Sequence, residues 1–141
     1  MPMRSLLLTM LFLLSWSGAM HATQPLDDRE ALSGLQSAKV IFDVRITDLD
    51  KLLFNLRLFE ETFEGMVAQG VKPEMIIAFR GPGVKLLSSA PLDEEVADLL
   101  RSLSNKGVRF EVCAVAMRIY KAAPEGLIPE LKLVANVLNS L

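Results

Sequence analysis

The sequence predicts an α/β domain of the three-layer type, in which helices flank a mostly parallel sheet of four to five strands. Runs that are apolar at every second residue alternate along the chain with longer runs whose apolar residues recur every three or four positions. Strands that alternate with helices in this way are typical of a parallel sheet. The 141 residues, 51% of them hydrophobic and 23% charged, are enough for one domain with a substantial core.

The first strand and the first helix follow one another directly. Residues 39–46 alternate, with an apolar face of Val40, Phe42, Val44 and Ile46. Thr47 or Asp48 is the predicted N-cap of the helix, and Gly70 stands where a left-handed C-terminal residue belongs. The apolar stripe of the helix consists of Leu49, Leu52, Leu53, Leu56, Phe59, Phe63, Met66 and Val67. Phe54 and Leu58 lie off this stripe, which favours a second packing partner, such as another subunit.

A second strand and a second helix are joined by a glycine-rich loop. The strand covers residues 74–80 and the loop residues 81–87. The helix signals are a cap at Ser88 or Ser89, Pro91 in the first turn, and the closing residues Lys106 and Gly107. The buried stripe of this helix consists of Leu92, Val96, Leu99, Leu100 and Leu103.

The rest of the chain supplies a third strand, and the pattern then becomes weaker. The strand is predicted over residues 108–115, with a short helix over residues 117–122. Residues 123–130 break the chain because they contain two prolines and a glycine. Residues 131–141 then hold a fourth strand and a half-turn of helix.

The N-terminus is typical of a secretory signal peptide over residues 1–22. Arg4 carries its only charge, residues 6–16 are free of charge, and small residues follow, so that cleavage is expected after Ala19 or Ala22. The apolar run is shorter than the roughly 20 residues of a membrane span. We therefore expect a periplasmic protein without a membrane span after cleavage, with a flexible leader over residues 23–37 and a domain over residues 38–141. An uncleaved N-terminal anchor is the alternative.

The residue inventory excludes several kinds of chemistry. His21 is the only histidine and lies in the predicted cleavage region, so a Ser-His-Asp triad, a Cys-His pair and a histidine metal site are all excluded from the domain. Cys113 is the only cysteine, which excludes an internal disulfide and a CxxC motif. The chain has no basic excess, so nucleic-acid binding is not expected.

Cys113 is the main candidate for chemistry. Alternation places it on the polar face of the third strand with Arg109 and Glu111, near the carboxyl end, where open α/β sheets bind ligands. A helix that starts just after Cys113 would direct backbone amides at the sulfur and favour the thiolate. The alternative is a buried structural residue, because free cysteine packs like a small hydrophobe.

Two other groups of residues are candidate sites. Gly81, Pro82 and Gly83 form a loop that allows close approach of an anion or of a neighbouring segment, although a plain tight turn explains the glycines as well. The acids Asp43, Asp48 and Asp50 follow one another near the end of the first strand. Two of them also suit helix capping, so neither a metal site nor a cofactor is predicted.

The order of these features resembles the DsrE/DsrF-like family of small α/β sulfur-handling proteins. The resemblance covers residues 39–141, and its most specific parts are the sequences "GPGVKLL" and "GVRFEVC". It implies that Cys113 carries sulfane sulfur as a persulfide and that Gly81, Pro82 and Gly83 lie close to it. It also implies a homo-oligomer, a trimer or a hexamer, and donor and acceptor proteins for the sulfur.

Three functional hypotheses follow. The first is an exported protein that binds or relays sulfane sulfur on Cys113 and is sulfurtransferase-like if active. The second is a non-enzymatic oligomeric binding or scaffold protein that keeps the fold, since Val115 stands where the family often has a polar residue. A phosphate- or nucleotide-binding domain is a weaker third hypothesis, because no Lys-Ser/Thr pair follows the glycines.

Overall fold

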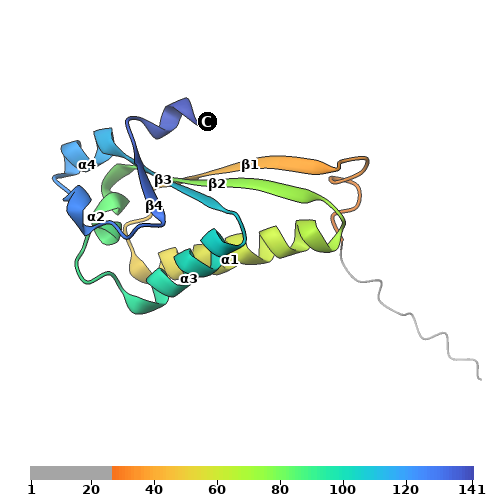
Figure 1. Ribbon diagram of the computed structural model, residues 1–141, viewed down its shortest axis with the longest axis horizontal. Helices are drawn as coiled ribbons and strands as arrows, with labels where there is room; N and C mark the ends of the chain where they lie inside the picture. The colour runs from red at the N-terminus through yellow and green to blue at the C-terminus, as the bar shows by residue number, and fades with distance from the viewer. Residues whose placement is uncertain (1–26) are drawn as a thin grey trace, which may run out of the picture.

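The computed structural model describes residues 27–141, so the predicted signal peptide and residues 23–26 of the predicted leader lie outside the described residues. Four strands form one parallel sheet in the order β1-β2-β3-β4 (Figure 1). The strands are β1 (Ser37–Val44), β2 (Lys72–Phe79), β3 (Arg109–Cys113) and β4 (Leu131–Val134). This confirms the predicted α/β class with a parallel sheet and flanking helices.

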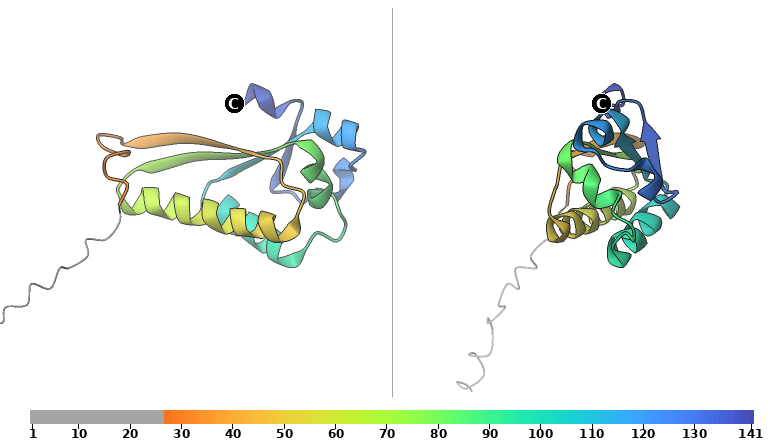
Figure 2. Two further views of the ribbon diagram at one scale, coloured as in Figure 1. Left: turned by 180° about the vertical axis from the view of Figure 1, so that it is seen from behind. Right: turned by 90° about the vertical axis from the view of Figure 1, so that its left-hand side faces the viewer.

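The helices separate into two groups. The long helices α1 (Leu49–Ala68) and α3 (Glu94–Asn105) lie side by side under one face of the sheet (Figures 1 and 2). At the carboxyl end of the strands, the short helix α2 (Val84–Leu87) packs with α4 (Ala114–Tyr120) and the 3-10 turn η1 (Gly81–Gly83). Two further 3-10 turns, η2 (Pro124–Gly126) and η3 (Val137–Asn139), flank β4, and η3 lies against β3.

The core lies between the sheet and the two long helices. The first face of the sheet faces α1 and α3 and carries Val40, Phe42, Val44, Met75, Ile77, Phe79, Phe110, Val112, Leu131 and the more exposed Leu133. Phe42 packs on Phe59 of α1 with ring centroids 4.4 Å apart. From the helices, the fully buried residues Leu56 and Leu100 fill the same layer. The alternation of apolar residues in the strands is therefore explained by one buried face.

The second face of the sheet, defined by the other strand positions, carries most of the polar residues. It consists of Lys39, Ile41, Asp43, Glu74, Ile76, Ala78, Arg109, Glu111, Cys113, Lys132 and Val134. The placement of Arg109, Glu111 and Cys113 together on this polar face confirms the prediction from alternation. Toward the carboxyl end, α4 and η3 lie on this side of the sheet (Figure 2).

The ends of α1 agree with the sequence. Asp48 is the N-cap, and its Oδ1 accepts a hydrogen bond of 2.9 Å from the backbone N–H of Lys51. Gly70 has a φ of 79°, the left-handed conformation that ends helices and that glycine adopts without strain. Phe54 and Leu58, the two apolar residues off the main stripe, are exposed on the outer side of the helix.

The second helix begins differently from the prediction. The N-cap of α3 is Asp93, whose side chain accepts from the backbone N–H of Val96 at 3.2 Å. The hydroxyls of Ser88 and Ser89 instead donate back to carbonyls of the preceding helix α2. Pro91 lies before the helix and not in its first turn. The prediction of a cap at these serines is wrong because α2 ends just before them, and their hydroxyls bond to carbonyl groups of α2 instead of capping α3.

Some boundaries also shift. β1 begins at Ser37, inside the predicted leader, because Ser37 pairs with Lys72 of β2. The third strand ends at Cys113, and α4 covers Ala114–Tyr120 in place of the predicted 117–122. The run of small and apolar residues after Cys113 fits a strand and a helix equally well, so periodicity could not locate the change. The predicted loop 81–87 is helical: η1 begins at Gly81 with Pro82 in its first turn, and α2 continues it.

The described part of the N-terminal segment lies at the opposite end of the sheet from Cys113. Residues 29–34 form turns, and the backbone N–H of Asp28 donates to Gln69 Oε1 at the end of α1. Among residues 27–141, no helix combines the length and the apolar character needed to span a membrane.

Candidate functional site

Cys113 is the last residue of β3, where the strand passes directly into α4. Its thiol is free, and the residue is 4% exposed. The S–H group donates to Oδ1 of Asn136, with 3.9 Å between sulfur and oxygen. The same Oδ1 accepts from the backbone N–H of Leu138, which fixes the amide orientation. Cys113 therefore lies beneath the turn that follows β4 rather than open to solvent.

Arg80 and Asp43 form a two-fold hydrogen-bonded pair at the same end of the sheet. Arg80 Nε donates to Asp43 Oδ1 at 2.7 Å, and Nη2 donates to Oδ2 at 2.6 Å. Arg45 adds a longer ion pair of 3.3 Å to Asp43 Oδ2. Bidentate pairing fixes the plane of the guanidinium as well as its position. Asp43 therefore holds Arg80 while leaving the other guanidinium N–H groups available.

The pKa values of both residues in this pair are shifted. The hydrogen bonds from Arg80 hold the pKa of Asp43 below its ordinary value, and the charge of Arg45 adds to this effect. The hydrogen bond with Asp43 in turn raises the pKa of Arg80, and the charge of Asp43 adds to this effect. The register of β2 and β3 places Arg80 on the strand next to Cys113.

Glu111 lies two residues before Cys113 on the same face of β3. It is 7% exposed, and it is the buried charged residue of the described part of the chain. Its Oε2 is buried without a hydrogen-bond partner among residues 27–141. Lys132 of β4 is its neighbour in register, but its ammonium forms no ion pair with the carboxylate. An unpaired buried carboxylate is costly and therefore unusual in a native domain.

The predicted binding loop lies near Cys113, but neighbouring protein atoms occupy the space beside its glycines. Gly81, Pro82 and Gly83 form η1, which packs against α4, the helix that begins after Cys113. A Cβ on Gly83 would lie 2.0 Å from the carbonyl oxygen of Ile46, and one on Gly81 would touch the Arg45 side chain. Close approach of a neighbouring segment, one of the two predicted reasons for the glycines, therefore accounts for Gly83.

The acids of the predicted metal option do not converge. Asp43 pairs with two arginines, and Asp48 caps α1. Within residues 27–141 no group of three His, Cys, Asp or Glu side chains is placed to hold a metal ion.

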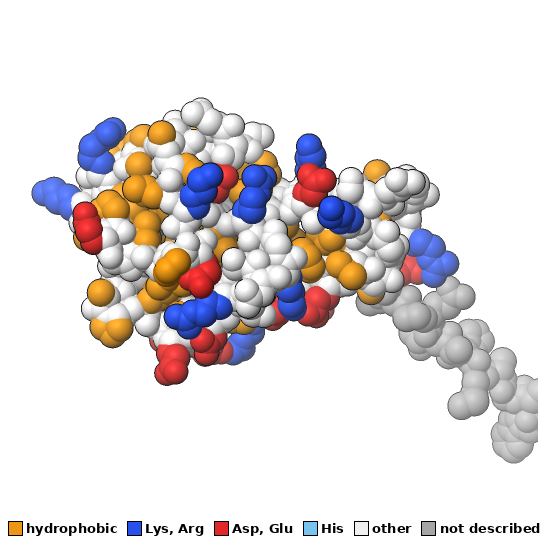
Figure 3. Space-filling model, viewed as in Figure 1, with side chains coloured by type: hydrophobic (Ala, Val, Ile, Leu, Met, Phe, Trp, Pro, Cys, Tyr) orange, Lys and Arg blue, Asp and Glu red, His pale blue; other side chains and the backbone are white. Residues whose placement is uncertain are grey.

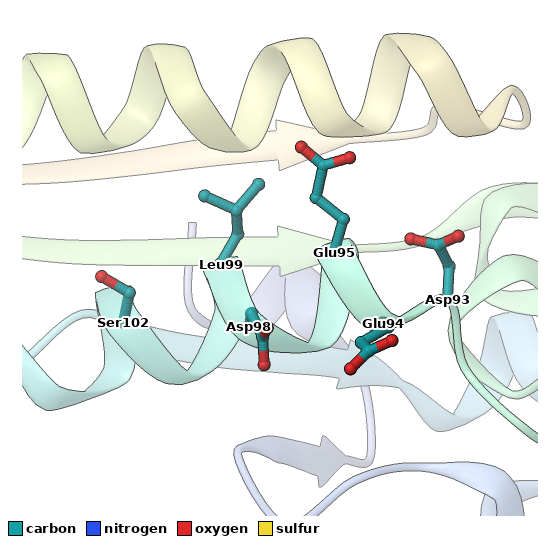
Figure 4. Close-up of a pocket in the computed structure, with 6 residues that line it drawn as sticks. All are labelled: Asp93, Glu94, Glu95, Asp98, Leu99 and Ser102. Atoms are coloured by element: carbon teal, nitrogen blue, oxygen red, sulfur yellow. The ribbon is translucent and has the colours of Figure 1, made fainter.

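A separate acidic hollow runs along α3, away from Cys113. It is lined by Asp93, Glu94, Glu95, Asp98, Leu99 and Ser102 (Figure 4). Several of its polar groups already have partners. Glu95 pairs with Arg57 of α1, Asp98 with Arg101, and the Ser102 hydroxyl donates to Glu60. These contacts hold α1 against α3 or stabilise α3 itself. The polar residues of the hollow therefore have a structural role in the packing of the two helices.

Two residues near the sulfur were missed by sequence reasoning. Arg80 was assigned to the end of the second strand without a role, and Asn136 was placed in an uncertain C-terminal stretch. A signal for Arg80 existed, because it stands at the carboxyl end of a strand in a parallel sheet, as Cys113 does. Asn136 contacts the cysteine although it lies 23 residues further along the sequence, and no local sequence pattern predicts such a contact.

The geometry defines a small parallel α/β domain with a cysteine and an arginine at the carboxyl ends of adjacent strands. A family model described as the DsrE/DsrF-like family matches residues 39–140. The chain therefore belongs to the DsrE/DsrF-like family, a family associated with sulfur relay, as the sequence resemblance predicted.

A solved structure supports the fold. It is that of the protein of unknown function MTH1491 from Methanobacterium thermoautotrophicum, which is 19% identical, with a TM-score of 0.57. The similarity covers 72% of this chain and 86% of that one. No curated protein matches the chain significantly.

Proposed function

We propose that this protein accepts sulfane sulfur on Cys113 and passes it on as a persulfide. The observation that carries the proposal is the position of the free thiol at the carboxyl end of β3, one register position past the Phe79–Val112 pair and so on the strand next to Arg80. Carboxyl ends of parallel strands are where open α/β sheets bind ligands, and a cation at that end attracts an anionic sulfur compound. Membership in a sulfur-relay family is consistent with this use of the residue.

The reaction needs no oxidant and no histidine. The Cys113 thiolate attacks the outer sulfur of a donor persulfide, so that the new S–S bond forms as the donor S–S bond breaks. The donor leaves as a thiolate with the electron pair and takes up the proton that Cys113 lost. An acceptor thiolate then attacks the outer sulfur on Cys113 and restores the free cysteine. Each step is a thiolate exchange at sulfur.

Access to the sulfur requires local movement. Cys113 is 4% exposed, so a donor reaches the sulfur only when the turn that carries Asn136 moves away. The contact from sulfur to Asn136 is a weak one, because thiols are poor donors. Opening this turn therefore costs little in hydrogen bonding.

Mass spectrometry of the folded protein tests the proposal. The chain is incubated with inorganic polysulfide, the excess is removed, and the intact mass is measured. We expect a gain of one sulfur atom that a reducing thiol removes, and no gain in the Cys113→Ser variant. An unchanged mass, or an adduct that survives in the variant, would rule out Cys113 as a sulfur carrier.

A second candidate function is favoured by the burial of the same residue. A binding or scaffold protein of this fold would keep Cys113 as a small core residue, and 4% exposure fits that role. This candidate predicts slow labelling of Cys113 by a thiol reagent and little functional loss in Cys113→Ser. Timed labelling under native conditions separates the two functions, because rapid labelling counts against a scaffold.

We propose further that the protein is exported and assembles with itself. Residues 1–22 have the charge and apolar pattern of a signal peptide, and Phe54 and Leu58 of α1 are exposed apolar side chains. Cell fractionation with N-terminal sequencing tests export, with a mature chain beginning after Ala19 or Ala22. A full-length chain in the cytoplasm would contradict it.

A further inference from the structure

We infer that Arg80, fixed by Asp43, is a positioning residue that stabilises the anionic persulfide on Cys113 and so favours the loaded state of the protein. This inference rests on the proposed function, because it concerns the same sulfur. It assigns a role to an ion pair that neither the fold nor the family match explains.

Strand register brings the two residues together. Phe79 of β2 pairs with Val112 of β3, so the next position on each strand is Arg80 beside Cys113. Arg80 is still extended, with φ −148° and ψ 179°, and its N–H donates to the carbonyl of Val44 at 3.0 Å. The parallel ladder between β1 and β2 therefore continues to Arg80. Paired positions of a parallel sheet point to the same face, so both side chains lie on the second face.

The guanidinium has donors to spare for a ligand. Asp43 accepts from Nε and Nη2 of Arg80, which leaves the N–H groups of Nη1 outside this pair. Arg80 is about a quarter exposed at the side chain, as is Asp43. The pair is thus partly open to solvent, at the end of the sheet where Cys113 lies.

The charged residues on this face of the sheet lie at different distances from Cys113. Adjacent strands lie about 4.8 Å apart, whereas positions two apart on one strand are separated by about 6.6 Å. The backbone of Arg80 is therefore closer to the backbone of Cys113 than that of Glu111 is, and the carboxylate of Glu111 opposes an anion at the sulfur. Asp43 lies one strand further away, on β1, together with Arg45, and Lys132 faces Glu111 from β4. By strand position, the charged residue nearest to Cys113 on its own face of the sheet is therefore a cation.

The Arg80 cation stabilises a persulfide on Cys113 more than it stabilises the thiol. Persulfides are in general stronger acids than thiols, so a persulfide is largely an anion at neutral pH. The added sulfur also extends the side chain by an S–S bond of about 2 Å. The outer sulfur carries the charge and moves beyond the Asn136 contact of the parent thiol. A cation on the neighbouring strand therefore stabilises the loaded state more than the empty one.

The test is the equilibrium ratio of loaded to empty Cys113 at a fixed concentration of inorganic polysulfide, read by intact mass. For Arg80→Gln we expect this ratio to fall about tenfold, which corresponds to about 1.4 kcal/mol. Arg80→Lys keeps the charge and should restore much of the loading. Arg80→Met is a second charge-free variant in case the glutamine variant does not fold. Arg109→Gln is the matched control, because it removes an arginine from the same sheet face at the far end of β3.

The outcomes separate the two ideas. Reduced loading in the charge-free variants, with rescue by lysine and normal loading in Arg109→Gln, supports the role of Arg80. Normal loading in Arg80→Gln, or an equal loss in Arg109→Gln, overturns that role and leaves the proposed function standing. If the unmodified protein takes up no sulfur, the proposed function fails and the role of Arg80 fails with it.

Discussion

Gly83 lies so close to Ile46 that a Cβ on residue 83 would come within 2.0 Å of the Ile46 carbonyl oxygen. The contact joins η1 to the segment between β1 and α1, next to the end of the sheet where Cys113 lies. Because the nearest atom belongs to the backbone, no side-chain rotation relieves the overlap. We expect Gly83→Ala to destabilise the fold by about 1–3 kcal/mol, the usual cost of overpacking, as measured by the urea midpoint.

Gly65→Ala is the matched control for this substitution. Gly65 lies inside α1, and a Cβ there meets nothing within 4 Å. Alanine is the better helix former, so the control should stabilise the protein by about 0.5–1 kcal/mol. Equal effects of the two substitutions would show that the contact between η1 and Ile46 does not constrain residue 83.

The sequence was sufficient for the class of fold because the main signals are local. The two-residue and three-to-four-residue periods predicted the strands and the long helices, and Asp48, Gly70 and Gly107 marked helix ends correctly. Errors arose where two interpretations had equal local support. The serines before α3 are good caps in isolation, but they are already bonded to α2.

The candidate site was harder to predict, because it depends on register. Alternation showed that Cys113 and Glu111 share a face of β3, but not which residues of β2 lie beside them. That information comes from the pairing of Phe79 with Val112, which places Arg80 beside Cys113 on the neighbouring strand. The burial of Cys113 likewise depends on the turn around Asn136, which is remote in sequence.

Glu111 gives a prediction about stability. Its Oε2 is buried without a partner among the described residues, and burying an unpaired carboxylate opposes folding. We expect Glu111→Met, which keeps the approximate shape without the charge, to stabilise the protein by about 1–3 kcal/mol. The measurement is the urea midpoint, with Glu74→Met on the same sheet face as an exposed control. A loss of stability specific to Glu111→Met would mean that the carboxylate has a stabilising partner in the assembled protein.

The Asp43–Arg80 pair predicts a loss of stability in acid. The pKa of Asp43 is lower in the folded protein than its ordinary value of about 3.9. A carboxylate of this kind stabilises the fold at a pH above its unfolded pKa, and the contribution disappears as the pH falls through the folded pKa. We therefore expect Asp43→Asn to have a lower free energy of unfolding than the parent protein near neutral pH. As the pH falls below about 4, the stability of the variant should decrease less than that of the parent protein. Urea midpoints between about pH 6 and pH 3 would reveal this, and parallel curves for the two proteins would contradict it.

The exposed apolar side chains of α1 give a prediction about assembly. Phe54 is 66% exposed and Leu58 is 43% exposed, one helical turn apart on the side of α1 that faces away from the sheet. Other exposed apolar side chains lie elsewhere, including Ile119 on α4 and Leu133 on β4. Figure 3 shows hydrophobic side chains gathered at the α2 and α4 end of the molecule and interspersed with charges over the rest of that face. The assembly surface is therefore best tested on one helix at a time.

We expect the double variant Phe54→Gln and Leu58→Gln to lower the molecular mass in solution to that of a monomer, as measured by light scattering. Both residues are largely outside the core. The free energy of unfolding of the domain, measured by urea titration, should therefore change by no more than about 0.5 kcal/mol. Ile119→Gln is the control, because it removes a similarly exposed apolar side chain from another helix. An unchanged oligomer in the double variant would exclude this side of α1 from the interface. A parent protein that is already monomeric would exclude self-assembly through any of these surfaces.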